Sequence, residues 1–210
     1  MNTAQDLSIY LVDDDAAFRR SVAFLLDSVG WTVVQYDSAQ AFLDAHAQPP
    51  ADLGCLLLDI RMPIMSGLVL QQHLRSRGWH AAIVFMTGHG DVELAVQAMK
   101  AGACDFLEKP FKDQALLDAV DQAVQRTREL QHHSQRQAGA RARLQRLSPR
   151  EHEVARLVAQ GHPNKTVARL LDISEKTVHV HRQHVLEKTE VANAAELTRL
   201  MLAADAQALD

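Results

Sequence analysis

The stretch Cys55-Leu56-Leu57-Leu58-Asp59-Ile60-Arg61-Met62-Pro63 decides the fold class, because a strand-like apolar run ends in a carboxylate and a proline turn. Three further strand-like runs are each followed by a polar side chain. Residues 9–12 precede Asp13, Asp14 and Asp15, residues 82–86 precede Thr87, and residues 104–108 precede Lys109. The carboxyl ends of parallel strands meet at one edge of a sheet, where ligands bind. The sequence therefore predicts that these polar side chains gather in one site.

Short apolar runs alternate with amphipathic stretches over residues 6–112. Strands are predicted near residues 8–12, 32–36, 53–58, 82–86 and 103–107. Helices are predicted near residues 16–29, 38–47, 67–77, 91–101 and from residue 112 onward. A βα repeat with five strands and short connections is typical of an α/β doubly wound, five-stranded parallel sheet of the flavodoxin-like kind.

Residues 147–210 carry helix signals and no strand pattern. Ser148-Pro149-Arg150-Glu151 combines a serine cap, a proline at the first helical position and a glutamate three residues after the cap. Gly161 ends this helix, a second begins near Asn164, Ser174 caps a third, and a fourth covers about residues 193–204. The second and third helices, joined by a tight turn, form a helix-turn-helix pattern within a small all-α four-helix domain.

The chain is expected to have three parts: a sheet domain at residues 6–122, a helical linker at residues 123–146, and the helical domain at residues 147–210. The first 113 residues carry 8 Lys+Arg against 14 Asp+Glu, whereas residues 114–146 carry 6 against 3. The linker is therefore basic between an acidic domain and a balanced one, and we interpret it as a continuation of the last helix of the sheet domain.

The composition favours a cytoplasmic protein. The 47% hydrophobic content and the net charge of −4 are those of an ordinary globular chain and predict no bulk attraction to nucleic acid or membrane. No apolar run approaches the roughly 18–20 residues of a membrane span, and the amino terminus lacks a signal-peptide pattern. Cys55 and Cys104 both lie in strand-like runs and are expected to be reduced.

The polar groups at the sheet edge suit a divalent metal and a phosphoryl group. Any one of Asp13, Asp14 and Asp59 alone is more often a solvated loop residue. Together such carboxylates raise one another's pKa unless a cation neutralises them, and Mg²⁺ binds one or two carboxylates together with water and phosphate oxygens. Asp59 is the candidate nucleophile, since carboxylates form aspartyl-phosphates, while Lys109 and Thr87 can stabilise the phosphoryl oxygens.

Four motifs in order resemble the receiver domain of two-component response regulators: Val12-Asp13-Asp14-Asp15, Asp59-Ile60-Arg61-Met62-Pro63-Ile64-Met65-Ser66-Gly67, Thr87-Gly88-His89-Gly90 and Lys109-Pro110-Phe111. The resemblance implies that a histidine kinase phosphorylates Asp59. It implies that Asp14, Asp59 and the backbone carbonyl of Arg61 bind Mg²⁺, with Asp13 acting through water.

The same resemblance assigns roles to the remaining pocket residues. Lys109 is implied to hold the phosphoryl group, with a cis Lys109–Pro110 bond. Thr87 and Phe106 are implied to be the switch pair, which rearranges on phosphorylation. Arg61 and His89 are implied to line the pocket entrance, where residues tune the lifetime of the phosphoryl group.

The carboxyl-terminal motifs Leu147-Ser148-Pro149-Arg150-Glu151, residues 161–168, residues 173–181 and Glu187-Lys188 resemble the DNA-binding domain of the LuxR/NarL/FixJ type. The third helix is expected to enter the major groove. The expected phosphate contacts are Lys165, Lys176, Thr177, Arg182 and Lys188. The expected base-reading residues are His179, Val180 and Gln183. His181 is interpreted as a structural residue that packs against the second helix.

Two departures from this family concern the end of the third helix and the helix that follows. Thr189 and Glu190 stand where relatives usually carry leucine and glycine, and Ala194 stands where many carry arginine. We therefore expect the end of the third helix and its turn to be less well packed, or shifted.

The two resemblances together imply a phosphorylation-controlled transcriptional regulator, not an enzyme beyond its own phosphoryl transfer and dephosphorylation. The expected partners are a histidine kinase, promoter DNA, RNA polymerase and a second copy of the chain, which would dimerise through the receiver face at residues 91–125 that includes Val92, Val96 and Met99. Two alternatives stay open: a phosphorylation-independent transcription factor with an unused receiver, and a metal-dependent phosphatase.

Overall fold

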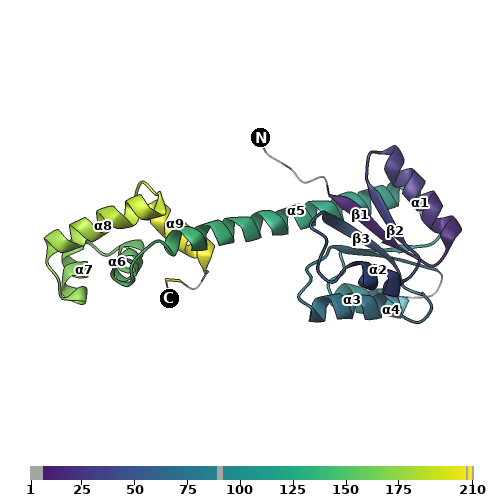
Figure 1. The fold of residues 1–210 in the computed structure, drawn as a ribbon, viewed down its shortest axis with the longest axis horizontal. Coiled ribbons are helices and arrows are strands. Elements are labelled where there is room, and N and C mark those ends of the chain that lie inside the picture. The colour runs from purple at the N-terminus through teal and green to yellow at the C-terminus, as the bar shows by residue number, and fades with distance from the viewer. Residues whose placement is uncertain (1–6, 89–91, 207, 210) are drawn as a thin grey trace. The chain divides into compact units, whose positions relative to one another are not determined.

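A computed structural model describes residues 7–88, 92–206, 208 and 209 (Figure 1). The chain separates into two compact units, Met1–Glu129 and Leu130–Asp210. Their boundary falls inside the stretch 123–146 that the sequence predicts as a linker. In the described part of the chain, no helix is both long enough and apolar enough to cross a membrane.

The first unit is built on a parallel sheet whose strand order is β2-β1-β3-β4-β5. The strands are β1 (Ser8–Val12), β2 (Val33–Tyr36), β3 (Leu53–Asp59), β4 (Ile83–Thr87) and β5 (Asp105–Glu108). The α/β doubly wound five-stranded sheet expected from the sequence is confirmed. All residues of β1, β3 and β4 are buried, which explains why their sequences are nearly continuous apolar runs.

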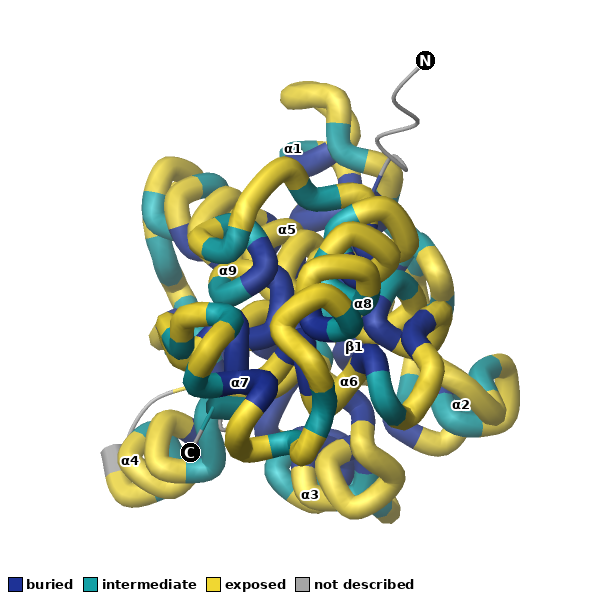
Figure 2. Tube along the Cα trace, turned by 90° about the vertical axis from the view of Figure 1, so that its left-hand side faces the viewer, coloured by how far each residue is buried: buried dark blue, intermediate teal, exposed yellow. Residues whose placement is uncertain are grey.

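Helices cover both faces of this sheet (Figure 1), and Figure 2 colours the buried parts of the chain dark blue. They are α1 (Ala16–Ser28), α2 (Ala39–Ala45), α3 (Gly67–Ser76), α4 (Val92–Lys100) and the beginning of α5 (Asp113–Leu144). One core cluster joins the sheet to α1 through Leu26 and to α5 through Val120. A second cluster joins the opposite face to α2 through Phe42, to α3 through Leu70 and to α4 through Ala98.

The second unit contains the end of α5 and four further helices, α6 (Pro149–Ala159), α7 (Asn164–Leu171), α8 (Glu175–Thr189) and α9 (Ala194–Ala204). The four-helix arrangement expected from the sequence is confirmed. Its core includes Val158, Val167, Val178 and Leu197, which lie on α6, α7, α8 and α9 in turn.

The helix boundaries follow from the caps that the sequence contains. The Ser148 hydroxyl accepts a hydrogen bond from the Glu151 backbone N–H, and the Glu151 carboxylate accepts one from the Ser148 N–H, so the predicted capping box at the start of α6 is present. Ser174 caps α8 through the Thr177 N–H. Gly161 follows α6 with a φ of +86°, a conformation that glycine adopts without strain.

The α5 helix contributes to both cores. Val120 and Val124 are buried in the first unit, whereas Ala140 and Leu144 are buried in the second. The stretch predicted as a linker is therefore helical, and its last turns belong to the hydrophobic core of the carboxyl-terminal unit.

Candidate functional site

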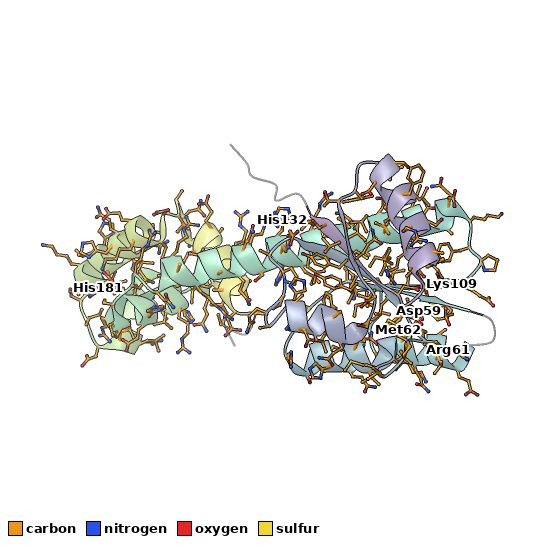
Figure 3. The ribbon with its side chains drawn as sticks, turned by 45° about the vertical axis from the view of Figure 1, so that its right-hand side comes forward. Asp59, Arg61, Met62, Lys109, His132 and His181 are labelled. Carbon is orange, nitrogen blue, oxygen red and sulfur yellow. The ribbon has the colours of Figure 1, made fainter. Side chains whose placement is uncertain are left out.

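The acidic pocket lies at the carboxyl edge of the sheet, where β1, β3, β4 and β5 end. Asp13 and Asp59 are 1% and 6% exposed, and the Lys109 ammonium lies between them. Lys109 Nζ is 2.6 Å from Asp13 Oδ2 and 2.6 Å from Asp59 Oδ1. Figure 3 shows the Lys109 and Asp59 side chains at this end of the sheet. The structure thus brings together three residues that are separated by up to 96 positions in the chain.

The backbone around Asp59 holds the carboxylate in place. The Arg61 N–H donates to Asp59 Oδ2 at 2.7 Å, and the Gly67 N–H donates to the Ile60 carbonyl at 3.0 Å. A Cβ at position 67 would lie 2.3 Å from the Asp59 carbonyl oxygen and 2.9 Å from Leu58 Cγ. Only glycine fits against the strand at that distance, so Gly67 allows α3 to begin directly beneath the phosphoacceptor candidate.

The charges in the pocket set the protonation states of its members. Burial raises the pKa of Asp59, with a further increase from neighbouring Asp13, while hydrogen bonding to Lys109 acts in the opposite direction. Burial tends to lower the pKa of Lys109, but its bonds to Asp13 and Asp59 outweigh this effect and leave that pKa raised. The ammonium therefore stays charged. One cation faces two carboxylates, so an added cation is favoured.

The other expected pocket residues lie around this centre. Asp14 and Arg61 are exposed, and Thr87 is 1% exposed at the end of β4. The Thr87 carbonyl accepts a hydrogen bond from the Lys109 N–H at 2.6 Å. Phe106 is half-buried in β5. The Lys109–Pro110 bond is cis, as expected, and His89 lies outside the described residues.

No three His, Cys, Asp or Glu side chains come close enough together to hold a metal by themselves, within residues 7–88, 92–206, 208 and 209. The pocket instead offers two buried carboxylates, the exposed carboxylate of Asp14 and nearby backbone carbonyls.

Several contacts of the pocket escape sequence reasoning. Asp15 was grouped with the acidic cluster, but its side chain caps α1 by accepting from the Ala17 and Phe18 N–H groups. The Phe18 ring lies 3.9 Å from Lys109 Nζ, a cation–π contact. Arg19 donates to the Asp13 carbonyl at 2.5 Å. The sequence predicts that a helix begins after Asp15, but which side of α1 faces Lys109 depends on tertiary packing.

A groove of about 320 Å³ opens beside the pocket, between α1 and the start of α5. Its lining includes Phe18, Phe24, Pro110 and Phe111, the last two directly after Lys109 in the chain. The Phe24 side chain is 78% exposed at its rim. The groove therefore combines aromatic rings with the polar side chains of Ser21, Ser28 and Asp113.

The exposed face of α8 carries most of the expected DNA-reading residues. Lys176, His179, Val180 and Gln183 are exposed on α8, and Lys165 is exposed on α7. Two others have partners within the domain. The Thr177 hydroxyl is 2.8 Å from the Ser174 hydroxyl, and an Arg182 nitrogen donates to Asn164 Oδ1 at 3.2 Å. His181, labelled in Figure 3, is half-buried.

Lys188 lies apart from this face. Its Nζ is 2.8 Å and 2.7 Å from the two carboxylate oxygens of Glu151, a residue that is 4% exposed. Burial alone would raise the pKa of Glu151, but hydrogen bonds from Lys188 and Ser148 lower it to about 2. The Lys188 ammonium, which the sequence suggests as a phosphate contact, thus neutralises a buried carboxylate.

The expectation that the end of α8 is less well packed is wrong. Thr189 is fully buried, and its hydroxyl donates to the Val185 carbonyl at 2.6 Å. Glu190 adopts the left-handed conformation, with φ 55° and ψ 44°, and its N–H donates to the Glu187 carbonyl at 3.2 Å. The Val191 N–H closes the turn on the Leu186 carbonyl at 3.1 Å. Glutamate therefore forms the turn that usually favours glycine.

Comparison with known proteins places both units in established families. Residues 9–121 match the response regulator receiver domain, and residues 145–201 match the bacterial regulatory proteins of the luxR family. The transcriptional regulatory protein FixJ of Azorhizobium caulinodans is 46% identical, over 95% of this chain and 94% of that protein. The response regulator protein TmoT of Ectopseudomonas mendocina is 41% identical, over 93% of this chain and 88% of that protein.

Solved structures agree with these relatives. The response regulator StyR superimposes with a TM-score of 0.83 at 41% identity, covering 93% of this chain and 98% of that one. Full-length FixJ from B. japonicum gives a TM-score of 0.59 at 43% identity, covering 94% and 96%. With an acidic pocket at the sheet edge and a helix-turn-helix beyond it, the chain belongs to the FixJ-type two-component response regulators, which are DNA-binding transcriptional regulators controlled by phosphorylation.

Proposed function

We propose that Asp59 is the phosphoacceptor and that a histidine kinase is its donor. The observation that carries this proposal is the Lys109 ammonium held 2.6 Å from Asp59 Oδ1 at the end of β3. An Asp59 carboxylate oxygen forms a bond to phosphorus while the P–N bond of a phosphohistidine breaks. The departing imidazole takes the electron pair and a proton from solvent. Lys109 then pairs with a phosphoryl oxygen and offsets its charge.

The donor set of the pocket fits Mg²⁺. This ion commonly binds through one or two carboxylates, with waters and phosphate oxygens completing its shell, so a cluster of three protein carboxylates is not required. Asp14, Asp59 and the Arg61 carbonyl would hold it, and Asp13 would act through water. When bound, the ion neutralises the charge of the transferring phosphoryl group. The excess of carboxylate over ammonium in the pocket supports this assignment.

Thr87 and Phe106 are the proposed switch pair. Thr87 is buried at the end of β4, and its carbonyl accepts a hydrogen bond from the N–H of Lys109, the residue whose ammonium bonds Asp59. We assign the Thr87 hydroxyl as a donor to the phosphoryl group and Phe106 as the ring that moves inward behind it. This local change of charge biases a two-state element.

The switch is proposed to act on the receiver face at residues 91–125, through which two copies of the chain pair. Val96 and Met99 on α4 are 46% and 45% exposed, an arrangement that leaves apolar side chains available for pairing. The side chain of Val92, the third residue expected there, lies outside the described residues. Pairing of two receivers raises the effective concentration of two DNA-binding domains on adjacent half-sites.

On promoter DNA, we assign phosphate contacts to Lys165, Lys176, Thr177 and Arg182, and base contacts to His179, Val180 and Gln183. The exposure of Lys176, His179, Val180 and Gln183 on one helix supports this division. Glutamine can pair with adenine, and valine can contact a thymine methyl group. We further propose that the bound dimer contacts RNA polymerase in the bacterial cytoplasm.

The test is phosphorylation by a small phosphodonor such as phosphoramidate in the presence of Mg²⁺. Intact-mass measurement should show one added phosphoryl group on the wild type and none on Asp59→Asn, while the exposed control Asp27→Asn behaves as wild type. Sizing and promoter binding should change with phosphorylation. If DNA binding were equal in all three proteins with and without the phosphodonor, the unused-receiver alternative would stand. Steady turnover of phosphate esters would favour the phosphatase.

A further inference from the structure

Two arginines, Arg143 in the last turn of α5 and Arg146 in the turn that follows this helix, reach the carboxyl end of α8. An Arg143 guanidinium nitrogen donates to the Glu190 carbonyl at 2.7 Å and lies 3.8 Å from Glu190 Oε2. An Arg146 nitrogen contacts the Lys188 carbonyl at 3.5 Å and forms an ion pair with Glu190 Oε1. We call Arg143, Arg146 and Glu190 the arginine clamp.

The clamp offsets an unfavourable charge at the carboxyl end of α8. The last carbonyls of a helix lack intrahelical partners and carry a partial negative charge, so a carboxylate there is repelled and cations are favoured. Glu190 adds a carboxylate at that point and also holds a positive φ of 55°. Hydrogen bonding and charge from Arg146 lower the pKa of Glu190, with a smaller contribution from Arg143. The arginines thereby stabilise a turn that disfavours this residue.

A second contact fixes the same turn to α6. Lys188 bonds both oxygens of the buried Glu151 carboxylate, which also accepts from the Ser148 N–H at 2.7 Å. The Nδ1 atom of His184 lies 3.7 Å from the Glu151 carboxylate as well. The last turn of α8 is therefore held by Arg143 and Arg146 on one side and by Glu151 at the start of α6 on the other.

We propose that Arg143, Arg146 and Lys188 are positioning residues for DNA recognition, which hold the carboxyl end of α8 through Glu190 and Glu151 and do not contact phosphate. They set the angle at which His179, Val180 and Gln183 meet the bases. This inference rests on the proposed reading face of α8. It makes the last turns of α5 part of the DNA-reading unit, together with the core residues Ala140 and Leu144.

The experiment uses the full-length protein and two DNA duplexes of equal length, one selected by the wild type from a random pool and one of random sequence. Affinity is measured across a series of salt concentrations. A residue that neutralises one phosphate contributes about 0.9 to the slope of log K against log salt. Lys176→Met, the matched phosphate-contact control, should lose about that slope and keep its preference for the selected duplex.

Lys188→Met should instead keep the wild-type salt slope and lose about tenfold in preference for the selected duplex, similar to one misplaced base contact. Because this change leaves Glu151 buried without its cation, the double variant Glu151→Gln/Lys188→Met is measured beside it and should recover part of the preference. A slope reduced by about one with the preference retained would make Lys188 a phosphate contact and overturn the proposal.

The clamp is tested in the same way by Arg146→Ala, which should reduce the preference at unchanged slope. Adding Glu190→Gly removes the repelled carboxylate and the positive-φ strain, so Arg146→Ala/Glu190→Gly should restore the preference. Failure of this rescue, with a reduced slope, would mean that Arg146 contacts DNA directly. An equal loss of affinity for both duplexes, together with a weaker helical circular dichroism signal, would mean that the clamp only stabilises the fold, and would overturn the proposal. If Lys176→Met kept the wild-type salt slope, the proposed DNA-reading face of α8 would be wrong, whatever the result for the clamp.

Discussion

Lys109 Nζ and Asp59 Oδ1 lie 2.6 Å apart although the two residues are 50 positions apart in the chain. The same ammonium bonds Asp13 at an equal distance, so one side chain neutralises part of the charge of two buried carboxylates. The pocket is consequently held together by the group that we propose as the partner of the phosphoryl oxygens, so its stability and its proposed chemistry depend on the same atoms.

Replacing Lys109 should therefore destabilise the receiver unit. Lys109→Met leaves Asp13 and Asp59 close together without their cation, and removing one partner of a buried ion pair costs about 3 kcal/mol. Urea unfolding followed by tryptophan fluorescence measures this, because Trp31 and Trp79 both belong to the receiver unit. The exposed neighbour Lys112→Met is the control. If Mg²⁺ did not reduce the loss in free energy of unfolding, repulsion between the two carboxylates would not be its cause.

Asp59→Asn should have the opposite effect. Burial raises the pKa of Asp59, so the folded state disfavours its charged form, and the stability linked to its protonation is lost as the pH rises through that raised pKa. At pH 7 the neutral asparagine should therefore stabilise the unit, and this gain should shrink as the pH falls below the ordinary pKa of an aspartate, 3.8. Mg²⁺ should raise the melting temperature of the wild type and leave that of Asp59→Asn nearly unchanged.

Gly67→Ala should damage the site through the backbone. Its Cβ would lie 2.3 Å from the Asp59 carbonyl, so the strand end or α3 must shift, at a cost of about 3 kcal/mol. Gly139→Ala is the matched control, because a Cβ there meets nothing within 4 Å inside a helix and should stabilise α5 by about 1 kcal/mol. Thermal unfolding and the phosphorylation yield are the readouts; equal melting temperatures for the two variants would refute the close approach.

Glu151 should make the carboxyl-terminal unit sensitive to acid. Its pKa is about 2 in the folded protein against an ordinary value of 4.5, so its contribution to stability is present above pH 4.5 and is lost as the pH falls toward 2. Calorimetry from pH 7 to pH 2 should show Glu151→Gln less stable at pH 7 and close to wild type at pH 2. Glu153→Gln, at an exposed position, serves as control. If the difference in stability between the wild type and Glu151→Gln stayed constant across this pH range, it would not depend on the charge of Glu151.

Phe24 should matter for a protein donor and not for a small one. Its ring is 78% exposed at the rim of the groove that adjoins Lys109, a suitable contact for the kinase. Phe24→Asp should slow phosphoryl transfer from the histidine kinase about tenfold, as loss of one apolar anchor does, while transfer from phosphoramidate stays unchanged. Equal slowing with both donors would place the defect in the pocket instead of the docking surface.

The sequence predicted the sheet because β1, β3 and β4 are continuous apolar runs, and it predicted that Asp13, Asp59 and Lys109 meet because parallel strands end at one edge. Neither inference needs knowledge of side-chain packing. The partners of Lys188 and Glu190 do need it, since Glu151 and Arg146 lie 37 and 44 residues away and are joined only by the packing of helices. The local sequence pattern predicts that a charged residue lies on a helix. Whether its side chain is available to DNA or pairs with another side chain depends on tertiary contacts.

The left-handed Glu190 also bears on how this sequence could have evolved. A glutamate at this turn without Arg146 would combine backbone strain with repulsion from the end of α8. The residues at positions 146 and 190 are thus coupled, because a change at one position alters the energetic cost of a change at the other. Replacing Arg146 while Glu190 remains is therefore disfavoured, so this pair restricts which single substitutions the carboxyl end of α8 can accept.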